Sequence, residues 1–482
     1  MLVHVWTMRL TAVFLAGHCS LALATRSPVA ERISRVEHGL LPAQVLKGTP
    51  LQPLTLAEEM QRLHVPGVSV AVIHDDKIAW AKGYGLTETG GVPVTPTTLF
   101  QAASISKSIT AMGAMQMVQS GLLDLDQPVN HYLKSWKLSG LEGSNAVTLR
   151  QLLSHTAGTN VSGFPGYAAG TPVPTILQVL DGAAPASTEA VRVTSAPGAQ
   201  WRYSGGGYSV IQQVMADVTS EPFERLMARR VLRPIGMTSS AFMQPASLAL
   251  KRRAAMPHDT SGKAVPGGPA SYPELAAAGM WTTPTDLAKF ALSMQRSANG
   301  KNGRVLRRES AAAMLAPVKN DYGLGLEIAA TGGALSFAHG GSNLGYQNSL
   351  FAYSTQGDGA VVMTNGDGGA DIARALIRSI AAEYGWPTYR VVERSAISIS
   401  AEAAKRMAGK YAIKGLGDFE ITEKDGELTF WIKAGQGERL YASSPATFFV
   451  LSQPLELHFD AADADGGRLK AGSFDVRFDA LR

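Results

Sequence analysis

The segment from Leu99 to Val118 most constrains what this chain can fold into. After Ser104 its apolar residues recur at helical spacing with small residues between them, which predicts a buried helix that Gly121 ends. The segment contains the chain's only S-x-x-K sequence, Ser104-Ile-Ser-Lys107. Three residues make about one helical turn, so we expect the serine hydroxyl and the lysine amine on one face, close enough to share a proton.

This pairing predicts nucleophilic catalysis. A lysine in an apolar helix is partly desolvated, which disfavours its charged form and lets it act as a base near neutral pH. The dipole and free N–H groups at the helix N-terminus favour negative charge developing at Ser104. The alternative is that S-x-x-K arises by chance in a chain of 482 residues, so further motifs have to decide.

Composition narrows the possible functions. The chain has 482 residues, 45% hydrophobic and 17% charged, so it can bury a large core and is expected to form two domains. The net charge is +5, but the longest basic cluster is only Lys251-Arg-Arg253, which does not favour nucleic-acid binding. No H-E-x-x-H motif is present, the histidines are scattered, and the single cysteine is Cys19. We therefore expect no metal, no cofactor and no disulfide.

Residues 1–24 are predicted to be an export signal. Arg9 precedes an apolar run from Leu10 to Leu23, and Ala22-Leu23-Ala24 forms an A-x-A cleavage site that leaves a mature chain beginning near Thr25. Translation could begin at Met1 or at Met8, since Met8-Arg9 resembles the start of a signal more closely. No other apolar run reaches the ~18 residues that span a membrane. The sequence thus predicts a periplasmic or secreted protein with no membrane span.

An α/β pattern of the α+β type continues over residues 25–390, the first predicted domain. Residues 65–73 and 78–85 predict a β-hairpin, and residues 336–342, 347–353 and 360–364 predict three successive strands. Residues 371–384 predict a helix across those strands, with other helices over 55–63, 147–158 and 209–218. One more helix is expected after an N-cap at Thr283 or Thr285.

Alternation of apolar residues marks a second domain over residues 391–482, after a boundary near Trp386-Pro387. Asp425-Gly426 predicts a two-residue hairpin turn within it. We expect a small antiparallel β domain, a barrel or a sandwich, that is separable by proteolysis and carries no catalytic residue.

Two motifs follow the S-x-x-K sequence along the chain: Tyr203-Ser-Gly205 and His339-Gly-Gly341. Together the three resemble the serine β-lactamase and penicillin-binding-protein family, specifically its class C-like branch of DD-peptidases, D-aminopeptidases and family VIII carboxylesterases. The resemblance covers roughly residues 50 to 385 and includes Leu152-Leu-Ser-His-Thr-Ala-Gly158 and Tyr322-Gly-Leu-Gly325. It implies an antiparallel sheet flanked by helices, with a helical subdomain.

The resemblance also implies roles for single residues. Ser104 would be the acyl-accepting nucleophile and Lys107 its proton partner. Tyr203 would be a general base whose pKa is lowered by nearby positive charge. His339 stands where β-lactamases keep a lysine. The backbone N–H groups of Ser104 and Ser342 would form the oxyanion hole.

Substrate binding is predicted on both sides of the nucleophile. Gly340 and Gly341 would let a substrate backbone lie against their strand. Gly205 replaces the asparagine whose amide contacts penicillins and peptides in the family, which disfavours β-lactam and D-Ala-D-Ala recognition. Phe164 and Tyr167, in the loop-rich stretch 159–200, are expected to line the pocket. His155 is interpreted as structural.

These features predict an exported serine hydrolase that cleaves an ester or amide bond in a small-molecule or peptide substrate. The alternatives are a DD-peptidase or D-aminopeptidase, a weak β-lactamase, or, in another class, a non-catalytic penicillin- or peptide-binding receptor. The chain has no G-x-S-x-G motif, which argues against an α/β-hydrolase. Nothing in the pattern predicts an oligomeric state.

Overall fold

The structure is a computed structural model that describes residues 28–413, 417–432, 437–460, 465–471 and 474–481. The predicted export signal, with its alternative starts at Met1 and Met8, lies outside these residues. Within the described part of the chain, every helix is too short or too polar to cross a bilayer.

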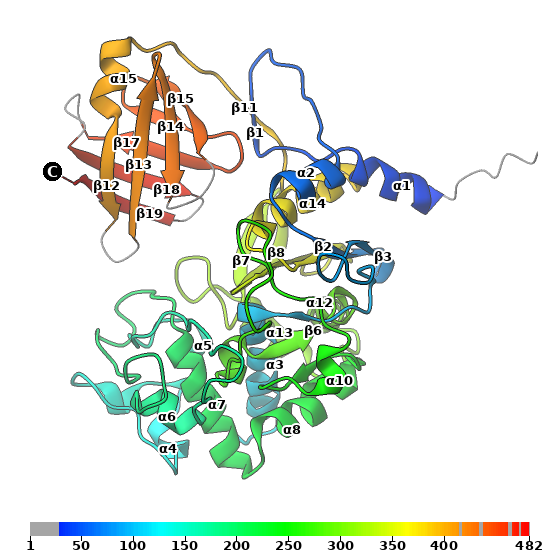
Figure 1. Cartoon of the computed structure of the whole chain (residues 1–482). Helices are drawn as coiled ribbons and strands as arrows, with labels where there is room; N and C mark the ends of the chain where they lie inside the picture. The colour runs from blue at the N-terminus through cyan, green and yellow to red at the C-terminus, as the bar shows by residue number, and fades with distance from the viewer. Residues whose placement is uncertain (1–27, 414–416, 433–436, 461–464, 472–473, 482) are drawn as a thin grey trace, which may run out of the picture.

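A six-stranded antiparallel sheet lies at the centre of the larger part of the molecule (Figure 1). The predicted hairpin forms two of its strands, and the three successive strands predicted near residue 340 form three more. In spatial order the strands are β3 (Lys77–Gly85), β2 (Gly67–His74), β10 (Gly359–Thr364), β9 (Tyr346–Tyr353), β8 (Ala334–Asn343) and β7 (Glu327–Thr331).

Helices cover both faces of this sheet. Side chains of a strand point alternately to its two faces, and in β2 Val68, Val70 and Val72 join one hydrophobic cluster while Ala71 and Ile73 join another. The first cluster is completed by α1 (Pro28–Glu37), α2 (Leu56–Arg62) and α14 (Gly369–Glu383). The second includes α3 (Ser106–Gln119), α12 (Pro284–Ala298) and α13 (Arg308–Leu315). Burial of both faces explains why β2 is apolar throughout.

The predicted nucleophile lies at the start of the most buried helix. Ser104 belongs to a short 3-10 turn, η1 (Ala103–Ile105), that leads directly into α3. The helix ends as predicted, since Ser120 is its C-cap and Gly121 follows with a φ of 73°.

A helical subdomain lies around and below α3 in Figure 1. It contains α4 (Val129–Tyr132), α5 (Leu149–Leu153), α6 (Ile176–Asp181), α7 (Gly205–Thr219), α8 (Phe223–Met227), a π-helical turn η3 (Ala228–Leu232), α9 (Arg233–Ile235), α10 (Leu248–Lys251) and α11 (Leu275–Ala278). A small sheet of β4 (Phe100–Gln101), β6 (Met280–Thr282) and β5 (Ala241–Phe242) connects it to the nucleophile segment.

Two helix starts refine the sequence prediction. Helix α7 begins at Gly205 and not at Ser209, because the Ser204 hydroxyl accepts a hydrogen bond from the Gly207 N–H and caps the helix there. The glycine run is therefore the first turn of the helix. For α12, Thr283 is the N-cap, since its side chain accepts from the Asp286 N–H.

The C-terminal strands form a closed eight-stranded antiparallel barrel filled by side chains of Tyr411, Phe419, Phe448, Leu457 and Phe478, with α15 (Ala401–Met407) packed on its core. The predicted turn at Asp425-Gly426 joins two of its strands. In order the strands are β12 (Gly409–Ile413), β13 (Gly417–Lys424), β14 (Glu427–Ile432), β15 (Glu438–Ser444), β16 (Thr447–Phe449), β17 (Leu455–Phe459), β18 (Gly466–Ala471) and β19 (Phe474–Ala480). The fold-class prediction is confirmed: a helix-flanked antiparallel sheet, a helical subdomain and a small C-terminal β domain.

The N-terminal part of the described chain is bonded to the barrel and to the strand that precedes it. Strand β1 (Gln44–Leu46) pairs in parallel with β11 (Val392–Arg394), which precedes the barrel. The buried Gln44 side-chain amide donates to the Val450 carbonyl at 2.7 Å and to the Gln453 carbonyl at 2.9 Å. The barrel is thus attached by a segment far away in sequence.

We expect Gln44→Ala to loosen this attachment. The change leaves two carbonyls without their donor, which for buried groups costs roughly 1–3 kcal/mol. Limited proteolysis should then cut the connection between residues 385 and 400 faster than in the wild type, while the larger part stays folded. Gln453→Ala is the matched control, because only the main-chain carbonyl of Gln453 takes part. Equal cleavage rates for Gln44→Ala and the wild type would contradict this role.

Candidate active site

Ser104 and Lys107 meet as predicted. The Lys107 amine lies 3.1 Å from the Ser104 hydroxyl oxygen and donates to the Ala277 carbonyl of α11 at 2.8 Å. The Lys107 side chain is buried, and burial lowers its pKa to about 7. A large part of the lysine population is therefore neutral at pH 7, which is the form that can accept a proton from Ser104.

Tyr203 comes to the same place from the loop before α7. Its phenol is hydrogen-bonded to the Ser104 side chain, and the Lys107 amine lies 4.9 Å from the centre of its ring. The expected lowering of the Tyr203 pKa is wrong in direction. Burial raises this pKa, and the Ser104 hydrogen bond opposes the rise without reversing it. About half of the lysine population is charged at pH 7, and burial still raises the Tyr203 pKa, so the geometry favours Lys107 as the base.

His155 forms hydrogen bonds with the residues directly before and after Tyr203. The His155 carbonyl accepts from the Arg202 N–H at 2.8 Å, and its ring Nδ1 accepts from the Ser204 N–H at 3.1 Å. The His155 ring also packs on the Tyr203 ring, with centroids 4.3 Å apart. Burial keeps the His155 pKa well below its usual value, so the ring stays neutral and its Nδ1 remains an acceptor. The sequence analysis interpreted His155 as structural and did not predict that it contacts Tyr203.

Strand β8 forms the opposite side of the site. Strand β7 pairs with β8 only as far as Ala338, and no described strand pairs with residues 339–343 on that side. Gly340 is exposed there, and the nearest atom to a Cβ on it would be the Asn348 carbonyl oxygen at 4.0 Å. A Cβ on Gly341 would lie 2.2 Å from the Ala102 carbonyl oxygen, so glycine is required where β8 passes the nucleophile segment. Ser342 is exposed, and its hydroxyl accepts from the Gln347 amide at 3.0 Å.

His339 is buried beneath this edge. Its Nδ1 lies 2.6 Å from the Gly340 carbonyl, and its ring centre is 6.4 Å from that of Tyr203. Burial, with a smaller contribution from the Lys107 charge, lowers its pKa to about 4. His339 is therefore neutral at pH 7 and does not supply the positive charge of a lysine at this position.

The loop residues predicted to bind substrate separate into two kinds. Phe164 is half-buried and its ring lies directly in front of Gly205. Tyr167 is buried, and its hydroxyl accepts from the Ser187 N–H at 3.0 Å. Its contacts are those of a residue that anchors the loop, and its predicted role in binding substrate stays a prediction.

Two contributors could not be identified from single residues. Ala277 acts through its carbonyl, which any residue type would supply, so the sequence carries no signal for it. Tyr322 packs against the rings of both His155 and His339, with centroids 4.9 and 6.3 Å away. The motif Tyr322-Gly-Leu-Gly325 marked the position but did not reveal this contact.

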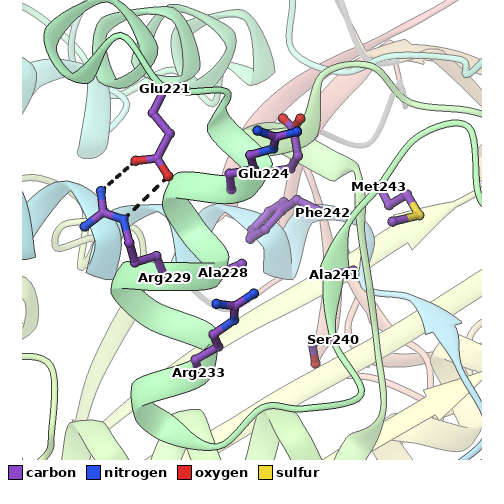
Figure 2. A pocket seen from close by; sticks show the side chains of 10 residues that line it. Glu221, Glu224, Ala228, Arg229, Arg233, Ser240, Ala241, Phe242 and Met243 are labelled. Atoms are coloured by element: carbon purple, nitrogen blue, oxygen red, sulfur yellow. Dashed lines mark hydrogen bonds and ion pairs between the residues drawn. The ribbon is translucent and has the colours of Figure 1, made fainter.

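A separate hollow of about 340 Å³ lies between α8, η3 and β5 (Figure 2). Its sides carry Glu221 and Arg229, which form an ion pair at 2.6 Å, and its floor contains Phe242. None of the residues predicted for catalysis lines it. Among the residues that the structure describes, no group of His, Cys, Asp and Glu side chains is arranged to hold a metal ion.

Residues 55–384 match the Beta-lactamase family, the range that contains all three motifs. The chain belongs to this family. Over 242 residues it is 24% identical to Protein flp of Staphylococcus aureus strain N315, covering 48% of this chain and 44% of flp, less than half the length of that curated relative.

Solved structures share the fold. The octameric penicillin-binding protein homologue from Pyrococcus abyssi aligns with a TM-score of 0.60 and 23% identity, over 88% of this chain and 98% of its own. D-amino acid amidase from Ochrobactrum anthropi SV3 aligns with a TM-score of 0.52 and 21% identity, over 68% and 98%. The D-amino acid amidase and the penicillin-binding protein homologue thus share the fold of this chain.

The lowered pKa of Lys107 predicts a pH profile. Only the neutral amine can take the Ser104 proton, so kcat/KM for an ester should rise with pH and reach half its maximum near pH 7, where the lysine deprotonates. His339, with a pKa of about 4, has already lost its proton below this range. His339→Asn should therefore keep the midpoint of the profile whatever its effect on rate. A wild-type profile that is flat between pH 5.5 and 8.5 would contradict the assignment of the base.

Two variants of His155 should separate the effect of its hydrogen-bond acceptor from the effect of its ring packing. Asparagine keeps an acceptor oxygen and tolerates the positive φ of 59° at this position, whereas phenylalanine keeps a ring and loses the acceptor. We expect His155→Phe to lower kcat ~10- to 100-fold with little change in KM, since the unpaired Ser204 N–H loosens Tyr203 and costs roughly 1–3 kcal/mol. His155→Asn should retain more activity. Equal losses in the two variants would show that the hydrogen bond does not matter.

Proposed function

We propose that this protein is an exported serine hydrolase that cleaves an ester or amide bond through an acyl-enzyme on Ser104. The observation that carries the proposal is the buried Lys107 amine, with a pKa of about 7, at 3.1 Å from the Ser104 hydroxyl. A receptor that only binds its ligand would need neither the nucleophile nor this base. The intact arrangement of Ser104, Lys107 and Tyr203 therefore favours an enzyme.

In the proposed mechanism, the Ser104 oxygen attacks the substrate carbonyl carbon while Lys107 takes the hydroxyl proton. Backbone N–H groups of Ser104 and Ser342 stabilise the oxyanion. The bond to the leaving group then breaks, and the proton passes from Lys107 to the leaving group, directly or through the Tyr203 phenol. Water attacks the acyl-enzyme with its proton going to Lys107. The bond between the acyl carbon and the Ser104 oxygen then breaks, Lys107 returns the proton to that oxygen, and the acid leaves.

The proposed chain organisation follows the sequence prediction. Residues 1–24 would direct export and be removed, residues 25–390 would carry all the catalytic groups, and residues 391–482 would form the barrel domain. Gly340 and Gly341 would receive the substrate along the open edge of β8, where no described strand pairs with residues 339–343. Likeness to a D-amino acid amidase supports amide cleavage as the second possibility beside ester cleavage.

Gly205 and His339 together favour esters over β-lactams. The first lacks the amide and the second the positive charge that contact penicillins in the family. A missing hydrogen bond to a buried or charged group costs roughly 1–3 kcal/mol, so kcat/KM for nitrocefin should be about 10- to 10⁴-fold below that of an efficient β-lactamase. p-Nitrophenyl acetate or butyrate needs neither contact and should be cleaved readily. The measurement is kcat/KM for nitrocefin and for the p-nitrophenyl ester on the same protein preparation.

Ser104→Ala provides the control for this comparison. It should abolish ester turnover and labelling by a fluorophosphonate probe, and intact-mass analysis of the wild type should detect the acyl-enzyme. Labelling that persists in Ser104→Ala would refute the nucleophile. Efficient nitrocefin hydrolysis with negligible ester cleavage would refute the substrate preference.

A further inference from the structure

The ring of Phe164 occupies the space into which a side chain at position 205 would project. A Cβ built on Gly205 would lie 2.8 Å from Cε2 and 3.4 Å from Cδ2 of this ring, closer than packed carbon atoms allow. Gly205 is the third residue of the motif that begins with Tyr203, so the ring lies beside the catalytic groups. The missing side chain has thus been replaced by an aromatic ring from another segment.

Hydrogen bonds hold the segment before Phe164 against the start of α7. The Ser204 hydroxyl donates to the Asn160 carbonyl, and the Gly205 N–H donates to the Ser162 carbonyl at 3.0 Å. Val161, between these two acceptors, has a φ of 56°, which is unusual for a β-branched residue and is typical of positions that tertiary contacts enforce. The backbone that delivers the ring is therefore fixed.

The ring is also held from the β8 side. It packs against Ala278, the neighbour of the residue whose carbonyl binds Lys107, and against Tyr272. The Tyr272 hydroxyl accepts from the N–H of Leu344, directly after β8, at 3.3 Å. Phe164 thus lies between the element that carries Tyr203 and the strand that carries Ser342, with part of its surface exposed.

We propose that Phe164 is the specificity-determining residue of the acyl subsite, and that it selects acyl groups with a flat apolar substituent, such as arylacetyl esters. This proposal rests on the proposed ester hydrolysis. The ring offers no hydrogen-bond donor or acceptor, so an acyl amide placed against it would lose water without compensation. An aryl group in the same place gains apolar burial and ring contact.

The test compares two esters that differ only in the acyl substituent, p-nitrophenyl phenylacetate and p-nitrophenyl acetate. We expect Phe164→Ala to lower the ratio of their kcat/KM values at least ~10-fold, the usual effect of removing an apolar pocket contact. Leu248→Ala removes a side chain that is 76% exposed on α10 and should leave the ratio unchanged.

Boronic acids provide a readout without turnover, because their boron binds the Ser104 oxygen while the hydroxyl proton passes to Lys107. Wild-type protein should bind benzylboronic acid more tightly than methylboronic acid, and Phe164→Ala should lose most of this preference. If esters are not cleaved but the preference holds, the proposed hydrolysis fails and the role of Phe164 stands. If esters are cleaved and the ratio does not change in Phe164→Ala, the role of Phe164 is overturned.

A double variant tests whether the ring occupies the place of the family's asparagine amide. Gly205→Asn in the Phe164→Ala background no longer meets the ring, and the closest remaining neighbour of its Cβ is the Ser162 carbonyl oxygen, at 3.2 Å. Its kcat/KM for nitrocefin should rise at least ~10-fold over Phe164→Ala alone. Gly205→Asn by itself has to displace the ring and should gain less. If Gly205→Asn raised kcat/KM for nitrocefin equally in the wild-type and the Phe164→Ala backgrounds, the ring would not occupy the place of the amide.

Discussion

The burial of one amine underlies the chemistry that we propose for this protein. Lys107 lies in a helix surrounded on all sides by packed side chains, and its amine has a serine hydroxyl and the Ala277 carbonyl as partners, with no carboxylate to stabilise its charge. Removing an ammonium from water without an anionic partner is costly, so the neutral form becomes accessible at pH 7. The core around α3 thus sets the proton affinity of Lys107, on which the proposed nucleophile Ser104 depends.

The site is built where three separate parts of the chain meet at Ser104. The helical subdomain brings Tyr203, held through His155, and the sheet brings β8 so close that only a glycine fits at position 341. A site of this kind requires fixed distances between Ser104, Tyr203 and β8, and main-chain hydrogen bonds and ring packing provide them. Within this frame the Phe164 ring packs against Gly205, at the end of the motif that begins with Tyr203.

Single residues show how far sequence patterns predicted the site. The Ser104 and Lys107 pair followed from helical spacing, because both residues belong to one turn and local geometry brings them together. The pKa of Tyr203 did not follow, because its direction depends on how deeply other segments bury the phenol. The start of α7 was predicted too late, since glycines disfavour a helix and only the Ser204 cap shows that it begins at Gly205.

By itself the sequence determined the hairpin, the three successive strands of the central sheet, the buried helix after Ser104, the motifs and the alternating β domain, because these depend on periodicity and on neighbouring residues. Tertiary structure decided which side chains contact each other when their residues are far apart in the sequence. It closed the C-terminal strands into a barrel held by Gln44, and it placed Phe164 in the space that Gly205 leaves. Contacts of this kind arise from packing between segments, and packing has no period in the sequence.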